Sequence, residues 1–128
     1  MKRTILTPWT YNYRVNNTSA QETFIVPRPL FLERIIVAGN LYTASASTSL
    51  GNVSVRRTNA TSLANPQVDM LASLQVEINN FAGPFATQGF NQNFEIGGLK
   101  LQQTQPLVLN WGTSAGVLVA SILMVFSE

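Results

Sequence analysis

The chain contains no cysteine and no histidine. Without cysteine it can form no disulfide, no thiolate metal site and no thiol nucleophile. Without histidine it has no imidazole base, which excludes Ser-His-Asp and Cys-His catalysis and histidine-ligated metals. Most common enzyme mechanisms are therefore excluded. We expect neither a catalytic site nor a metal or other cofactor.

Charged side chains are also scarce: they make up 11% of the 128 residues, less than half of the roughly 25% typical of soluble domains. Asn, Gln, Ser and Thr occupy 42 positions in their place. The net charge is only +2, and the one dense basic pair is Arg56-Arg57. Proteins that bind nucleic acid need several cations along the phosphate backbone, so we expect no nucleic-acid partner.

Short apolar segments separated by turn residues recur along the whole chain. Val53–Arg56 and Leu74–Ile78 alternate with a period of two, as half-buried strands do. The expected strands are Thr23–Val26, Phe31–Ala38, Leu41–Ser45, Val53–Arg56, Leu74–Ile78, Phe94–Gln102, Leu107–Trp111 and Val117–Phe126. Gly39-Asn40 is expected to turn the second strand into the third, and Ser45–Asn52 to form a polar loop. Many short strands without a βαβ rhythm predict an all-β protein, an antiparallel sandwich or jelly roll of about eight strands.

Few residues in the sequence favour a helix. Asn65 and Pro66 fit the N-cap and first position of a helix, and Val68, Leu71 and Ala72 then fall on one helical stripe. A strand over the same residues fits about equally well. The sequence therefore predicts at most one short helix.

Three aromatic residues, Trp9, Tyr11 and Tyr13, occupy alternate positions near the N-terminus. Disordered tails rarely carry so many rings, so we expect residues 1–21 to form an extended arm and residues 22–128 the sandwich domain. The three rings should face one way and dock outside the sandwich core, on the same chain or on a neighbouring copy. On this interpretation, deletion of residues 1–16 leaves the sandwich folded and weakens assembly.

A second aromatic segment, residues 81–94, holds Phe81, Phe85, Phe90 and Phe94 among Gly, Pro, Asn and Gln. Loops rarely expose large apolar groups. These rings therefore either fold back over one end of the sandwich or contact a partner. Together with the three aromatic residues of the arm, Phe81, Phe85 and Phe90 are our candidate subunit contacts.

The run Val117–Phe126 does not alternate between polar and apolar residues. It is too short for a membrane helix, which needs about 20 residues, and we expect no membrane partner. A strand that is apolar on both sides should be covered on both faces. The cover is the arm, the Phe-rich segment or another subunit, and with the low charge this favours a homo-oligomer.

Two groups of residues could form a chemical site, and each has an ordinary structural role as the alternative. Glu33, Asp69, Glu77 and Glu95 could supply a carboxylate pair, but Glu77 and Glu95 alternate with apolar residues and should face solvent. Trp111, Asn91 and Asn93 could bind a sugar by stacking and hydrogen bonding. The competing interpretation places Trp111 in the packing at the rim of the sandwich.

The aromatic arm (PWTYNYRVNN), the amide- and hydroxyl-rich body and the closing hairpin of residues 106–126 (PLVLNWGTSAGVLVASILMVF) together resemble small β-sandwich or jelly-roll virion proteins of bacteriophages. That group includes capsid decoration proteins and minor head or tail components. The resemblance implies a non-enzymatic structural role in the virion, assembled in the host cytoplasm. Its implied partners are other copies of the chain and a major capsid protein. Carbohydrate-binding, lectin-like modules for receptor recognition have similar sequence features, and such a module is the alternative.

Overall fold

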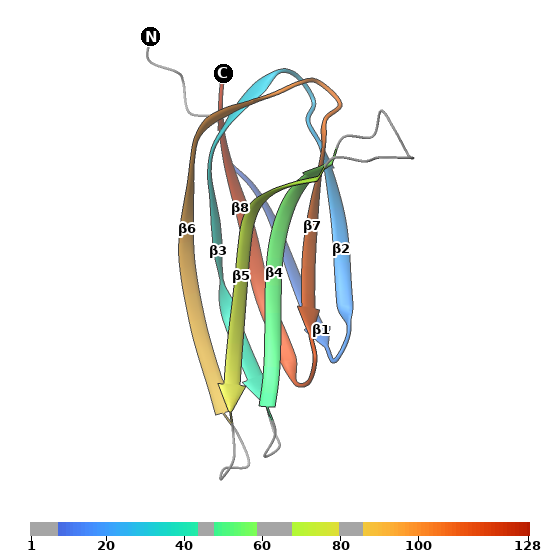
Figure 1. Cartoon of the computed structure of the whole chain (residues 1–128), viewed down its shortest axis with the longest axis vertical. Coiled ribbons are helices and arrows are strands. Elements are labelled where there is room, and N and C mark those ends of the chain that lie inside the picture. The colour runs from blue at the N-terminus through green and yellow to red at the C-terminus, as the bar shows by residue number, and fades with distance from the viewer. Residues whose placement is uncertain (1–7, 44–47, 59–67, 80–85) are drawn as a thin grey trace.

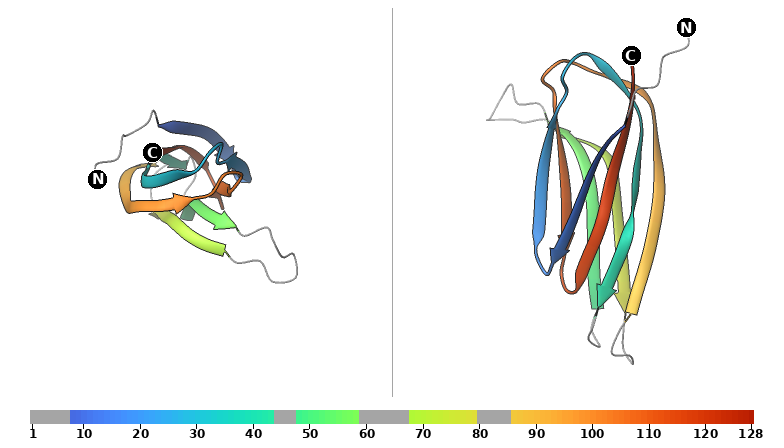
Figure 2. Two further views of the ribbon diagram at one scale, coloured as in Figure 1. Left: turned by 90° about the horizontal axis from the view of Figure 1, so that it is seen from above. Right: turned by 180° about the vertical axis from the view of Figure 1, so that it is seen from behind.

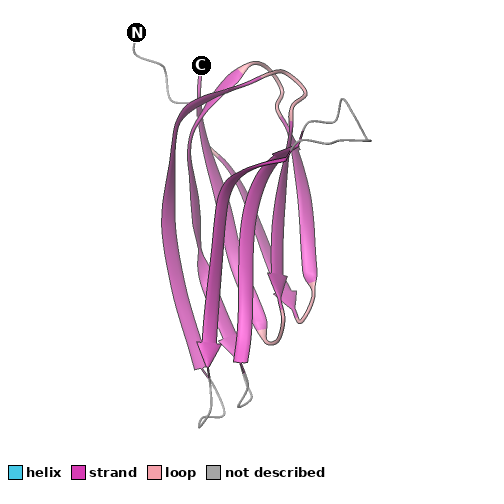
Figure 3. Cartoon of the chain, viewed as in Figure 1, coloured by secondary structure: helices cyan, strands magenta, loops and turns pink. Residues whose placement is uncertain are grey.

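The computed structural model describes residues 8–43, 48–58, 68–79 and 86–128, and these form eight strands (Figure 1). The strands are β1 (Trp9–Asn16), β2 (Ser19–Ile25), β3 (Leu30–Thr43), β4 (Thr48–Thr58), β5 (Val68–Asn79), β6 (Ala86–Leu101), β7 (Pro106–Thr113) and β8 (Val117–Ser127). Within these residues there is no helix (Figure 3), and hence none that could cross a membrane.

The strands pair antiparallel in two four-stranded sheets that lie face to face (Figures 1 and 2). Sheet A has the order β1-β8-β3-β6, and sheet B has the order β2-β7-β4-β5. The first strand thus pairs with the last, the second with the seventh, the third with the sixth and the fourth with the fifth. Such nesting arises when one long hairpin rolls up into two layers, which is the jelly-roll arrangement. The predicted fold class is confirmed.

The core lies between the sheets. Because side chains alternate along a strand, every second residue of the central strands faces the opposite sheet. Trp111 of β7 and Phe126 of β8 are the largest side chains that are fully buried there. Others from both sheets are Leu30, Leu32, Ile35, Leu41, Leu107, Leu109, Leu118, Ile122 and Met124.

The possible helix at residues 65–73 is not present in the part that can be described. Residues 65–67 lie outside the described residues, and residues 68–73 belong to β5. This strand pairs with β4 from Val68 to Asn79, with one register shift at Leu71, and buries Ala72, Val76 and Ile78. The long ladder and this period-two burial outweigh the weak helical preference of so short a segment.

One expected turn is wrong, and one expected loop is too long. Gly39 and Asn40 do not turn the chain but lie inside β3. A Cβ on Gly39 would come within 2.1 Å of the carbonyl oxygen of Val119, so the glycine permits close approach of β8 rather than a turn. Of the expected polar loop, residues 45–47 lie outside the described residues, and Thr48–Asn52 belong to β4, where Ser49 and Gly51 face inward.

Candidate interaction surfaces

The outer face of sheet A carries an apolar stripe along its two central strands. The stripe consists of Ile36 and Ala38 on β3 and of Val117, Val119, Leu123 and Val125 on β8. Three polar residues on the same two strands also face outward, namely Arg34 and Asn40 on β3 and Ser121 on β8. Val119 is 37% exposed, and most of the others are half-buried. Seen from behind, no described element crosses this face (Figure 2). Residues 117–126 are therefore apolar on both sides except at Ser121. Among the described residues no element lies over their outer side, where only Val125 is buried.

Polar residues flank this stripe on both edge strands. On β1 the outward residues are Thr10, Asn12, Arg14 and Asn16, and on β6 they are Thr87, Gly89, Asn91, Asn93 and Glu95. An apolar centre with a polar rim is the usual layout of a protein–protein interface.

The aromatic residues of the N-terminal segment lie elsewhere than we expected. Residues 9–16 pair with β8 of the same chain, so this segment is an edge strand of the sandwich and not an arm outside it. Its rings do share one side, as the alternation predicted, but that side faces the other sheet. Tyr11 and Tyr13 pack against the core, and a chain division at residue 21 would fall inside β2.

Trp9 closes one end of the sandwich through ring contacts to both sheets. Its ring centroid lies 5.3 Å from that of Phe24 on β2 and 5.5 Å from that of Phe126 on β8. Phe24 and Phe126 stack on each other at 5.4 Å. Such pairs each add about 0.5–1.5 kcal/mol beyond the burial of their area. Trp9 thus joins both sheets of its own chain while 37% of its surface remains exposed.

Tyr13 connects the two edge strands β1 and β2 across the sandwich. Its hydroxyl donates a hydrogen bond to Oε2 of Glu22, and its ring lies 4.5 Å from Trp111. The hydrogen bond to the carboxylate, with burial and the negative charge of Glu22, raises the pKa of Tyr13. Burial, followed by the charge of Glu22, also raises the pKa of Tyr11.

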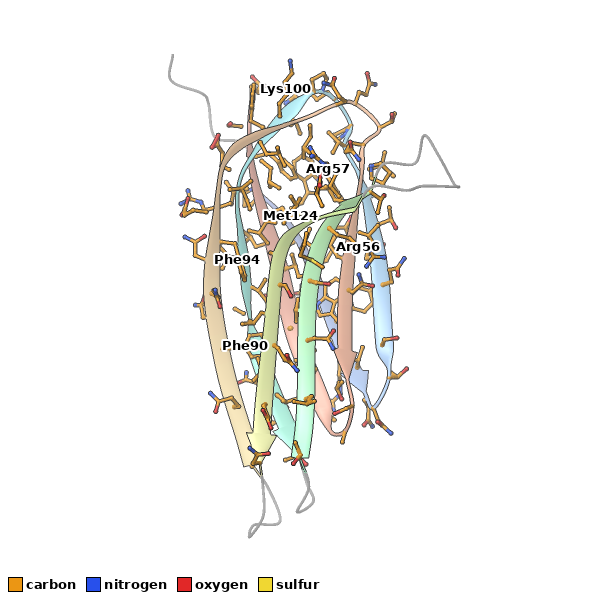
Figure 4. All side chains as sticks on the ribbon, in the orientation of Figure 1. Arg56, Arg57, Phe90, Phe94, Lys100 and Met124 are labelled. Carbon is orange, nitrogen blue, oxygen red and sulfur yellow. The ribbon has the colours of Figure 1, made fainter. Side chains whose placement is uncertain are left out.

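The Phe-rich segment is only partly a loop. Phe81 and Phe85 lie outside the described residues. Phe90 and Phe94 belong to β6, where they are half-buried and pack against the core (Figure 4). For these two rings the structure favours the packing interpretation, because their positions on β6 direct them toward the interior.

The residues considered for sugar binding do not form one surface. Trp111 on sheet B is fully buried, so its ring is not accessible for stacking on a sugar. Asn91 and Asn93 are exposed on β6 of sheet A, in the rim described above. The structure thus separates the ring from the two amides.

A polar hollow of about 630 Å³ lies instead on the outer face of sheet B. It is lined by Thr18, Ser19, Asn52, Ser54, Arg56, Asn110, Trp111, Gly112, Thr113 and Ser114. It is an open depression of the surface, and its aromatic member, Trp111, exposes no surface. Hydroxyl and amide groups can accept a polar ligand, but the stacking platform typical of sugar sites is missing from this lining.

The carboxylates considered for catalysis have ordinary partners or face solvent. Asp69 accepts a hydrogen bond from Nε of Arg57 at 3.0 Å. Ser127 Oγ donates to Glu33 Oε1, and Asn93 Nδ2 to Glu95 Oε1, both at 2.8 Å. Glu77 and Glu95 are exposed, as their alternation predicted. Among the described residues, no three acidic groups gather into a potential metal site.

The part of the apolar stripe on β8 could be predicted from the sequence, but the part on β3 was missed. The run on β8 is evident in the sequence, whereas residues 31–38 were expected to form an ordinary strand. Ile35-Ile36-Val37-Ala38 is itself an uninterrupted apolar run, with Ile35 and Val37 in the core and Ile36 and Ala38 outside. Two adjacent runs of this type would have indicated a shared outer surface.

No protein-family model matches the chain, and no curated protein matches it in sequence. Among solved structures it is similar to a chain of Desmodium yellow mottle tymovirus, with a TM-score of 0.41 and 10% identity over 100% of this chain and 89% of that one. It is also similar to a chain in the structure of the infectious bursal disease virus Gx strain, with a TM-score of 0.35 and 11% identity over 95% of this chain and 32% of that one. Both similarities are distant.

Proposed function

We propose that this protein is a non-enzymatic structural component of a virion that acts through contacts between subunits. The observation that carries the proposal is the apolar stripe on the outer face of sheet A, which has polar rims and no cover among the described residues. A contiguous apolar surface of this kind marks an interaction site more often than a free surface.

The fold is compatible with this role but does not by itself select it. Jelly rolls occur in viral capsid proteins, lectins and cupins, and function must be argued from sites. Histidine is the commonest protein ligand of metals, and this chain has none. A lectin role through Trp111 would need an accessible ring, whereas Trp111 is buried. A structural role through subunit contacts needs only the apolar outer face of sheet A.

In its more specific form, the proposal is a bacteriophage decoration or minor capsid protein. Its partners would be copies of itself and a major capsid protein, and it would be assembled into the virion in the host cytoplasm. The low charge and the amide-rich surface fit a subunit whose outer faces are covered by neutral contacts rather than by ions.

Quantitative mass spectrometry of gradient-purified particles tests the proposal. We expect the chain at a fixed molar ratio to the major capsid protein through successive gradients, while a non-structural protein of the same virus is lost. A decoration protein should be released by mild chaotrope from shells that remain closed, whereas release only on shell disassembly indicates an integral component. Absence of the chain from washed particles would refute the virion role.

A further inference from the structure

The outer face of sheet A is organised in rows that run across all four strands. From β1 to β6, the rows are Thr10–Leu123–Ile36–Asn93, Asn12–Ser121–Ala38–Asn91, Arg14–Val119–Asn40–Gly89 and Asn16–Val117–Tyr42–Thr87. In each row the two outer positions are polar residues or glycine, and the central position on β8 is apolar or small. The central position on β3 is apolar in the first two rows and is Asn40 or Tyr42 in the other two.

We propose that two copies of the chain pack through this face about a two-fold axis parallel to the strands, between β3 and β8. The axis places β8 of each copy over β3 of the other, and β1 of each over β6 of the other. The inference deepens the proposed function and rests on it, because it names a second copy as the partner that covers the apolar stripe.

The size of the face is adequate for a specific contact. Strands are about 4.8 Å apart and rise about 3.4 Å per residue. Four strands with about nine residues each therefore present roughly 600 Å² per copy, or about 1,200 Å² in total. This area lies at the lower end of stable protein–protein interfaces, which begin at about 1,200 Å².

The central rows are complementary to themselves under this two-fold axis. Leu123 lies over Ile36 of the partner subunit, so that large apolar side chains meet. In the next row, Ser121 lies over Ala38 of the partner subunit, and both are small. Neither of these two rows carries a charge, which matters near the axis of an isologous contact because side chains there lie close to their own copies and like charges would repel. Arg34, the next outward residue on β3, lies one row farther along and is paired in register with Glu95 on β6.

The rims are complementary as well. The amides Asn12 on β1 and Asn91 on β6 fall over one another in the two copies, where they can exchange hydrogen bonds. The longest rim side chain, Arg14, falls over Gly89 of the partner subunit, the one outward position of β6 in these rows that has no side chain. Packed sheets are typically rotated by about 30°, and the length of the arginine side chain accommodates the resulting offset.

The position of Gly89 gives a sharp charge test. Its Cβ would meet only the end of the flexible Asn40 side chain at 3.2 Å and the carbonyl oxygen of Gly39 at 4.0 Å, so the subunit should tolerate substitution. Gly89→Arg places a cation against Arg14 of the partner subunit and should weaken dimerisation about tenfold, whereas Gly89→Glu should strengthen it. The double variant Arg14→Glu with Gly89→Arg should restore wild-type affinity.

The measurement is sedimentation equilibrium over a range of protein concentrations, with circular dichroism as a check of folding. The matched control is Ser73→Arg, an exposed position on the outer face of sheet B, which should leave dimerisation unchanged. Leu123→Arg in the centre of the stripe should abolish dimerisation without unfolding the subunit.

A wild-type chain that stays monomeric at about 100 μM, well above the concentration needed for a micromolar dimer, overturns the inference. So does a dimer that responds equally to Gly89→Arg and Gly89→Glu. If the monomer is still incorporated stoichiometrically into particles, the proposed function stands, and another capsid protein covers this face. If the dimer behaves as expected but the chain is absent from particles, the contact stands and the virion role fails.

Discussion

At the scale of single residues, Tyr13 and Glu22 form the most informative pair. They lie on β1 and β2, the edge strands of opposite sheets, and are joined by the hydrogen bond from the Tyr13 hydroxyl to the carboxylate. Only the protonated phenol can donate this bond. Folding therefore stabilises the neutral form of Tyr13, and the raised pKa has a direct consequence for stability at high pH.

We predict that Tyr13→Phe makes the alkaline loss of stability shallower. Because the folded-state pKa of Tyr13 lies above its ordinary value of 10.0, the folded protein holds the proton more tightly than the unfolded chain. The contribution is complete below about pH 10 and is lost as the pH rises through the folded-state value. Urea unfolding measured between pH 8 and pH 11 should show this decline for the wild type and a weaker one for the variant.

Asn12→Ala, an outward-facing substitution on the same strand, should keep the wild-type pH dependence. At neutral pH, Tyr13→Phe should be less stable than the wild type because Glu22 loses a hydrogen-bond partner. Parallel pH profiles for the wild type and Tyr13→Phe would show that the hydrogen bond is not formed in solution.

At the scale of elements, β1 is an integral edge of sheet A. Every residue from Trp9 to Asn16 pairs with β8, Val15 is buried, and Trp9 contacts rings from both sheets. The order of the strands makes β1 the only described neighbour of β8 on that side. Removal of β1 would expose a long hydrophobic edge of the kind that promotes aggregation.

We therefore predict that deletion of residues 1–16 abolishes cooperative folding. The loss of a paired strand, of Val15 and of the Trp9 ring contacts should exceed the roughly 5–15 kcal/mol by which domains of this size are stable. Thermal unfolding followed by circular dichroism should show a clear transition for the full chain and none for the truncated one. A truncated chain that melts cooperatively would restore the interpretation of residues 1–21 as a separable arm.

The elements could be predicted from the sequence where the pattern was local. The period of two at residues 74–78 and the apolar run at 117–126 placed β5 and β8 correctly. Strand ends were missed where a residue usually found in turns has a different role. Gly39 allows close contact with β8, and the polar Thr48–Asn52 segment is held in β4 by pairing with β5 and β7. Such contacts depend on residues distant in sequence.

The candidate surface was harder to predict than the fold. Alternation showed that Trp9, Tyr11 and Tyr13 share one side, but not whether that side faces a neighbour or the chain's own core. The answer depends on the pairing of β1 with β8, more than 100 residues away. The apolar stripe likewise exists only because β3 and β8 are adjacent in sheet A.

At the scale of the whole molecule, the nested strand order determines how the two sheets can form. Sheet A joins the first and last strands of the chain, and sheet B joins the second with the seventh. Sequence-distant pairing of this type must overcome the loop-closure entropy before its contacts form. Neither sheet can be completed early by local hairpins alone, since only β4 and β5 are both consecutive in sequence and paired.

We predict that the subunit folds slowly and in one cooperative step. Proteins dominated by distant strand pairing refold in about milliseconds to seconds, far more slowly than helical bundles. The two tryptophans provide suitable probes, because Trp111 is buried between the sheets and Trp9 reports on the contact of β1 with Phe24 and Phe126. Fluorescence and far-UV circular dichroism should therefore give coincident denaturant transitions. The experiment needs protein concentrations low enough for the monomer, so that subunit association does not contribute. Separate transitions would mean that β1, or one whole sheet, forms independently. In that case β1 and β8 would not fold together, as their pairing in sheet A requires.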